Sequence, residues 1–177
     1  MKKHIFYLLA FTLVSSMAFG QRGFHTIGVG VEGALPMGDF ADAFGIGYGA
    51  SGNAFYGITE QGDITGTVGY LRFGMKDESD FVSGSMGMIP IMFGYRHSFG
   101  GLYAAPQLGL HLLKSTVKIT EDLGPGLSGL GGSTSETKFS LGIVGGYATG
   151  KLDFGARFQL VDQMNYVGLR IGYNFSL

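Results

Sequence analysis

The sequence predicts an all-β protein, an eight-stranded antiparallel up-and-down transmembrane β-barrel that is preceded by a cleavable signal peptide. Three observations predict this fold class. Charged residues make up only 14% of the chain, well below the roughly 25% of a soluble domain, whereas 45% of the residues are hydrophobic. Apolar residues alternate with small or polar ones along most of the chain, as in strands that have two different faces. Long and short connections between these stretches also alternate, which is typical of membrane-spanning barrels.

The start of the chain has the three-part layout of a secretory signal peptide. Lys2 and Lys3 are followed by an uninterrupted apolar run over residues 5–14, and small residues then precede a cleavage point before Gln21. A single membrane anchor is the alternative interpretation, since the segment is barely long enough to cross a bilayer. We expect a signal peptide over residues 1–20 and one domain, the barrel, over residues 21–177.

The last eleven residues show the alternation most clearly. Val167, Ile171 and Phe175 belong to an apolar set that alternates with small or polar residues such as Gly168 and Arg170. In a strand the two sets face opposite sides of the sheet. The same pattern predicts eight strands, over residues 26–35, 46–54, 64–70, 88–96, 102–112, 139–148, 152–160 and 167–177.

The connections between the predicted strands differ in length. The long ones are 36–44, 74–84 and 115–137, and the short ones are 57–62, 97–101, 149–150 and 162–165. This layout places both ends of the barrel on the same, periplasmic side of the membrane. The apolar faces are then buried in lipid, provided that the sheet closes and leaves no unpaired edge.

Aromatic residues gather near both ends of the predicted strands. Phe55 and Tyr173 fall near the periplasmic ends, and Phe73 and Tyr166 fall near the outer ends. Aromatic side chains are favoured where a membrane protein meets the lipid headgroups. We therefore expect two aromatic belts around the outside of the barrel.

Three segments carry a resemblance to a known family: the C-terminal strand 167–177, the turn Leu35-Pro36-Met37-Gly38-Asp39-Phe40 and the segment Ile89-Pro90-Ile91. The chain resembles the small outer-membrane β-barrels of Gram-negative bacteria, the OmpA/OmpX-like barrels, over its whole mature length. The resemblance implies residence in the outer membrane and contact with outer-membrane lipid. It also implies that the barrel-insertion machinery recognises the last strand, although this chain ends in Leu177, with Phe175 two residues before it, rather than in an aromatic residue.

A soluble periplasmic barrel of the lipocalin type is the competing structure. Its apolar face would point inward around a ligand, and its polar face would point toward water. The polar face predicted here consists mostly of glycine, serine and threonine with few charges, which makes a poor surface for a soluble protein. The composition therefore favours the membrane barrel.

Five charged residues are predicted to face the inside of the barrel: Glu32, Arg96, Asp153, Arg157 and Arg170. Glu32 and Arg170 should be neighbours if the first and last strands pair. Arg157 and Arg170 should face each other across the last hairpin, with Glu32 relieving their repulsion. Because buried charges must be paired and small barrels fill their interiors with side chains, we expect an ion network that closes the lumen. The alternative is a selectivity constriction in a narrow passive channel for small solutes.

Four uncharged polar residues are also predicted to line the lumen: Gln107, His111, Ser140 and Gln159. His111 and Ser140 lie on adjacent strands at similar height, the arrangement of a base and a nucleophile. No acidic residue is placed to orient the histidine, so we interpret both as lumen lining and predict no catalytic residue. Without cysteine or histidines at ligand spacing, the sequence also predicts no metal site and no cofactor.

These observations predict a monomer without enzymatic activity, which has a structural role in the envelope or interacts through its loops. The formal net charge of −1 provides no basic surface, so no nucleic-acid partner is expected.

Overall fold

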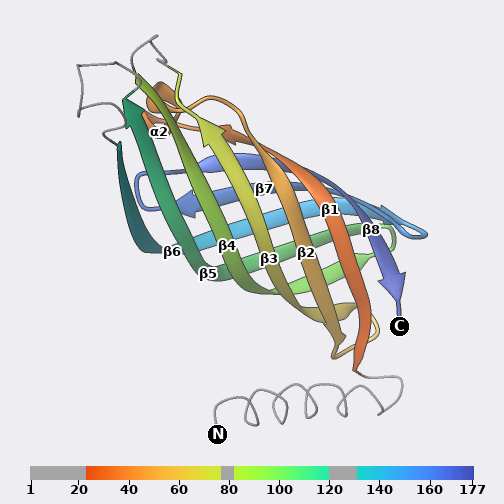
Figure 1. Ribbon diagram of the computed structural model, residues 1–177. Coiled ribbons are helices and arrows are strands. Elements are labelled where there is room, and N and C mark those ends of the chain that lie inside the picture. Colours follow the sequence, from red (N-terminus) through yellow and green to blue (C-terminus); the bar gives the residue numbers. More distant parts are fainter. Residues whose placement is uncertain (1–22, 77–81, 120–130) are drawn as a thin grey trace, which may run out of the picture.

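The computed structural model describes residues 23–76, 82–119 and 131–177. Its strands form a closed barrel in which each strand pairs antiparallel with the next and the last pairs with the first (Figure 1). The strands are β1 (Phe24–Pro36), β2 (Gly47–Gly57), β3 (Gly62–Gly74), β4 (Val82–Phe99), β5 (Leu102–Ile119), β6 (Gly131–Thr149), β7 (Leu152–Val161) and β8 (Tyr166–Ser176). The predicted eight-stranded up-and-down barrel is confirmed.

The predicted signal peptide lies outside the described residues and stays a prediction. Within the described part of the chain, none of the helical segments has the length and apolar character that a membrane-crossing helix needs.

The two ends of the barrel differ. We call the end that holds the connections β2–β3, β4–β5 and β6–β7 the turn end, because two of these three connections consist of two residues. The start of β1 and the C-terminus lie at this end (Figure 1). The opposite end, which we call the loop end, holds the connections β1–β2, β3–β4, β5–β6 and β7–β8.

The outside of the barrel is apolar and the inside is small, polar or charged. Val31 and Leu169 are each 65% exposed on the outer surface, whereas their sequence neighbours Glu32 and Arg170 are buried. Alternation along the other strands follows the same orientation. This is the reverse of the orientation that a lipocalin-type barrel requires.

Strands β4, β5 and β6 are 18, 18 and 19 residues long, considerably longer than the sequence predicts. They extend past the other strands at the loop end (Figure 1). Most of the predicted connection 115–137 therefore belongs to strands, and only residues 120–130 of it lie outside the described part. The prediction was wrong because this extension is exposed on both faces over residues 132–137, so its residues are polar on both faces and do not alternate.

A short helix, α2 (Asp39–Ala43), lies within the predicted connection 36–44. Gly38 precedes it with a φ of 61°, a left-handed conformation that glycine adopts without strain. The helix buries Phe40, whose ring lies 5.0 Å from that of Phe73 in an edge-on arrangement. Figure 1 shows α2 at the loop end of the barrel.

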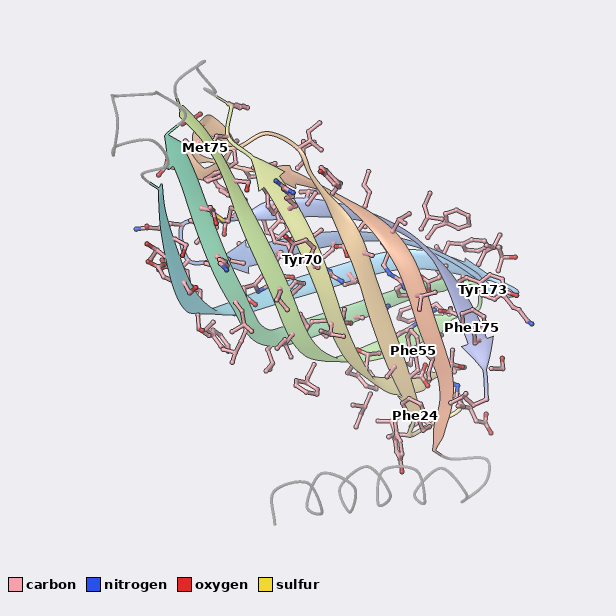
Figure 2. The ribbon with its side chains drawn as sticks, in the orientation of Figure 1. Phe24, Phe55, Tyr70, Met75, Tyr173 and Phe175 are labelled. Atoms are coloured by element: carbon pink, nitrogen blue, oxygen red, sulfur yellow. The ribbon has the colours of Figure 1, made fainter. Side chains whose placement is uncertain are left out.

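The predicted aromatic belts are wrong for three residues. Phe55, Phe73 and Tyr166 are buried inside the barrel rather than placed toward lipid. Each of them lies at a position whose side chain faces inward in the alternation along its strand. The alternation, and not the position near the strand end, decides which side the ring faces. Tyr173 and Phe175 do lie on the outer surface of β8, near the turn end (Figure 2).

Candidate functional site: the barrel lumen

Charged side chains occupy the half of the lumen nearer the turn end. Asp153 on β7 lies at their centre and is 1% exposed. Its carboxylate accepts hydrogen bonds from Arg96 Nη1 at 3.0 Å, from Arg170 Nη1 at 3.3 Å and from the Tyr103 hydroxyl at 2.8 Å. Strands β4 and β7 are separated by two other strands, so the Arg96–Asp153 pair crosses the lumen. We call the residues Glu32, Arg96, Asp153, Arg157 and Arg170 the ion cluster.

The pairing within the ion cluster differs from the one that the sequence predicts. Glu32 and Arg170 are register partners on β1 and β8, as expected. The carboxylate of Glu32 nevertheless pairs with Arg157, at 3.3 Å, while Arg170 pairs with Asp153. Arg157 lies opposite Gly168 on β8, so Arg157 and Arg170 do not face each other across the last hairpin. Long side chains lean along the strands, so register alone does not decide which charges meet.

Glycines on the inner face provide the space that these long side chains occupy. A Cβ atom on Gly172 would lie 2.5 Å from Arg170 Nη1, and one on Gly168 would lie 2.8 Å from a carboxylate oxygen of Glu32. Contacts this short do not occur between a real Cβ and its neighbours, so a side chain at either position would displace the charged group. The inward-facing glycines therefore provide the room that the ion cluster needs.

Aromatic and hydroxyl groups complete the surroundings of the arginines. The guanidinium of Arg96 lies over the Tyr103 ring, with its carbon 3.7 Å from the centroid, and 5.2 Å from the centroid of Phe55. Such stacking stabilises a buried cation. Arg170 Nε donates to the hydroxyl of Ser51 at 3.0 Å. Tyr103, Phe55 and Ser51 are not among the predicted site residues, although the alternation along their strands places all three on the inward face.

The uncharged polar residues form a layer near the middle of the lumen. His111 and Ser140 are buried and hydrogen-bonded, with His111 Nδ1 and Ser140 Oγ 2.8 Å apart. His111 Nε2 lies 3.1 Å from the Tyr166 hydroxyl. Gln159 donates to the carbonyl oxygen of Leu141, whereas Gln107 lies closer to the arginines, in the wall of a small cavity.

The half of the lumen nearer the loop end is filled by apolar side chains. We call this group the apolar cap; its members are Ala34, Phe40, Leu71, Phe73, Met86, Met88, Leu113, Val161 and Tyr166. Helix α2 contributes Phe40, and strands contribute the other members.

Little space remains between these layers. A cavity of about 30 Å³ lies among Arg96, Arg157, Arg170 and the polar residues around them. This is enough for one or two water molecules and too little for a solute. Among the described residues, no three histidine, aspartate or glutamate side chains lie close enough together to hold a metal ion.

Comparisons with known proteins identify the fold. No protein-family model and no curated protein sequence matches the chain. Its structure is similar to that of Ail, the attachment invasion locus protein of Yersinia pestis, with a TM-score of 0.64 at 16% identity over 88% of this chain and 100% of that one. This is the fold of the small outer-membrane β-barrels.

Two further structures show how widely this fold is shared. The outer-membrane protein OprG of Pseudomonas aeruginosa has a TM-score of 0.54 at 11% identity, over 89% of this chain and 99% of that one. A de novo designed transmembrane β-barrel has a TM-score of 0.50 at 11% identity, over 89% of this chain and 100% of that one. Since a designed chain adopts the same small-barrel fold, the fold does not supply a function.

Proposed function

We propose that this protein is a monomeric barrel of the Gram-negative outer membrane with a closed lumen, and that its role is structural or depends on surfaces at its loop end. We also propose that it neither conducts solutes through its lumen nor catalyses a reaction. We further propose that the last strand, with outward-facing Tyr173 and Phe175, is what the barrel-insertion machinery recognises.

Placement in the membrane is supported by the outer surface. Leucine, isoleucine, valine and aromatic side chains cover it, and a soluble protein rarely exposes apolar patches of that extent. Closure of the sheet pairs the backbone groups that an open edge would leave without partners in lipid. The small outer-membrane barrels that share the fold support the same placement. With both ends of the barrel domain at the turn end, that end would face the periplasm.

The proposal of a closed lumen depends on one observation, an ion pair that spans the width of the lumen. The Arg96–Asp153 pair joins opposite walls, and the apolar cap fills the other half of the lumen. A solute would have to break a buried ion pair and displace packed side chains, and both steps cost free energy.

The absence of catalysis is supported by the surroundings of His111. Among the described contacts, its ring nitrogens meet hydroxyls and not carboxylates: Nδ1 lies 2.8 Å from Ser140 Oγ and Nε2 lies 3.1 Å from the Tyr166 hydroxyl. A base that activates a nucleophile is in turn oriented by a third group, usually a carboxylate. His111 and Ser140 are also buried, so no substrate reaches them. A His111→Ala variant that lost a hydrolase or acyltransferase activity of the purified barrel would overturn this part of the proposal.

Two measurements test the proposal. Membrane fractions are run on gels with and without heating, and we expect the unheated protein to migrate as a compact folded barrel in the outer-membrane fraction. Protein in the soluble periplasm without a shift would overturn the membrane placement. Barrels that pass this test are then inserted into planar bilayers, where we expect no single-channel steps. Regular steps would support the alternative, a narrow passive channel, and overturn the closed lumen.

A further inference from the structure

Two cations stand out on the otherwise apolar outer surface. On the outward faces of the strands, among the side chains that the structure describes, Arg72 and Lys114 are the only arginine, lysine, aspartate or glutamate residues. Both are exposed and both lie toward the loop end. A basic residue that faces the bilayer core costs about 2–4 kcal/mol at the midplane and less near the interfaces. Basic residues on the outer surface are therefore expected at the level of the lipid headgroups.

The register places the two cations in one row across the sheet. Arg72 on β3 lies opposite Gly87 on β4, and Gly87 lies opposite Lys114 on β5. Lys114 in turn lies opposite Ser135 on β6. Because adjacent strands are about 4.8 Å apart, the backbones of Arg72 and Lys114 are roughly 10 Å apart. The residue between them is a glycine, and the end of the Tyr70 ring lies over it, since a Cβ atom on Gly87 would be 3.1 Å from the Tyr70 hydroxyl.

A hollow of about 630 Å³ occupies this part of the surface, which we call the cationic groove. Arg72, Gly87 and Lys114 line it together with Tyr70, Ile89 and Leu112. Ile89 and Leu112 are register partners and lie one row nearer the middle of the barrel. Figure 2 shows Tyr70 on β3, between the loop end and the middle of the barrel. The groove thus has cations on the side of the loop end and apolar side chains on the side of the membrane middle.

One carboxylate also borders the groove. Glu136 is 57% exposed and lies 3.8 Å from Lys138 Nζ, which compensates its charge. None of the ion pairs among the described side chains involves Arg72 or Lys114. The balance of charge in the groove is therefore positive.

We propose that the cationic groove binds the phosphorylated headgroup of a lipid in the leaflet at the loop end. The guanidinium of Arg72 donates a fork of hydrogen bonds to phosphate, and the ammonium of Lys114 adds a second charge. An acyl chain of the same lipid lies along Ile89 and Leu112. An acidic protein segment would pair with the two cations but would leave the neighbouring apolar side chains, Ile89 and Leu112, without a contact. A lipid contacts both, so it fits the groove better. The inference rests on the proposed membrane placement, because only a membrane brings such a lipid to this surface.

The test uses the detergent-solubilised full-length barrel with lipid A as the probe. Bound lipid is counted by native mass spectrometry for lipid A with its phosphates and for the same lipid A after enzymatic removal of the phosphates. We expect the wild type to retain the phosphorylated form preferentially. Because each basic residue near a membrane surface contributes about 1 kcal/mol toward anionic lipid, an Arg72→Gln/Lys114→Gln variant should bind the phosphorylated lipid about 30-fold more weakly. Equal retention of the two lipids, or equal retention by the double variant, would overturn the inference.

Two further variants separate the groove from general charge. Lys151→Gln removes one positive charge at the turn end, where Lys151 lies over the Tyr173 ring, and should leave retention unchanged. Gly87→Leu keeps both cations but places an apolar side chain between them and displaces the Tyr70 ring, since a Cβ at this position would lie 3.1 Å from the Tyr70 hydroxyl. It should lower retention as the double variant does. A loss with Lys151→Gln, or no loss with Gly87→Leu, would mean that net charge and not the groove holds the lipid.

The heated and unheated gel distinguishes the two proposals. A barrel that shifts on heating and lies in the outer membrane, but does not discriminate between the two lipids, contradicts the lipid site alone. A chain that fails the gel test contradicts the membrane placement whatever lipid it binds.

Discussion

Toward the turn end two carboxylates and three guanidiniums occupy the lumen, whereas toward the loop end packed apolar side chains occupy it. The ion cluster joins β1, β4, β7 and β8 through contacts between particular atoms. The apolar cap uses contacts that depend on volume and shape. Packed apolar cores tolerate substitutions that keep the volume, whereas a buried charge that loses its partner strongly destabilises the fold. These two stretches of one lumen should therefore respond differently to mutation and to salt.

The largest effect is expected from Asp153→Ala. The substitution leaves Arg96 and Arg170 buried without their shared carboxylate, which should lower the free energy of unfolding by about 3–5 kcal/mol. Urea titration of the folded barrel, followed by its mobility on unheated gels, measures this loss. Asp63→Ala is the matched control, because Asp63 pairs with the half-exposed His25 and its loss should cost less than about 1 kcal/mol. Equal losses would show that the ion cluster is no more important than a surface pair.

The apolar cap is tested by Phe40→Ala. Loss of a buried phenylalanine costs about 3–5 kcal/mol, and the lower end is expected here because a short helix can move to fill the space. Met37→Ala, close to the same helix and 41% exposed, should cost far less. Repeating both urea titrations in high salt should leave the cost of Phe40→Ala unchanged, because no charge is involved. A loss for Phe40→Ala no greater than for Met37→Ala would show that α2 does not contribute to closure.

How much of this could be predicted from the sequence depends on whether the two faces of a strand have different surroundings. Along β8 they do, since Ile171 lies on the outer surface and Arg170 lies in the lumen, and so the strands, their orientation and the inward-facing charges follow from alternation. At the loop end both faces of β6 are exposed over residues 132–137, so the pattern disappears there while the strand continues.

The pairing inside the lumen was not predictable for a different reason. Alternation shows that Glu32, Arg157 and Arg170 face inward, but the reach of each side chain and the space left by glycines decide which charges meet. Phe40 shows the same limit, because nothing in the period of the strands indicates that a connection folds back over the loop end.

A smaller effect tests whether glycine is required around the ion cluster. Gly172→Leu should displace the Arg170 guanidinium from Asp153 and cost about 1–3 kcal/mol of unfolding free energy, as overpacking does. Gly33→Leu is the matched control, because nothing lies within 4 Å of a Cβ atom at Gly33. It should cost little, because the added side chain would lie in open space on the outer surface. If the two variants lose the same stability, the glycines of the inner face serve the backbone and not the arginines.

The smallest effect is expected at the boundary between the two regions. Tyr166 packs in the apolar cap through its ring, 6.3 Å from the ring of Phe73, while its hydroxyl is hydrogen-bonded to His111. Tyr166→Phe keeps the packing and removes the hydrogen bond, so the loss should be about 1–2 kcal/mol, including the cost of leaving His111 Nε2 buried without a partner. Tyr95→Phe is the control, because its hydroxyl makes the same kind of contact to His97 at 3.2 Å on the outer surface, where removing it should cost less. A larger loss for Tyr95→Phe than for Tyr166→Phe would mean that the polar layer does not couple the apolar cap to the rest of the lumen.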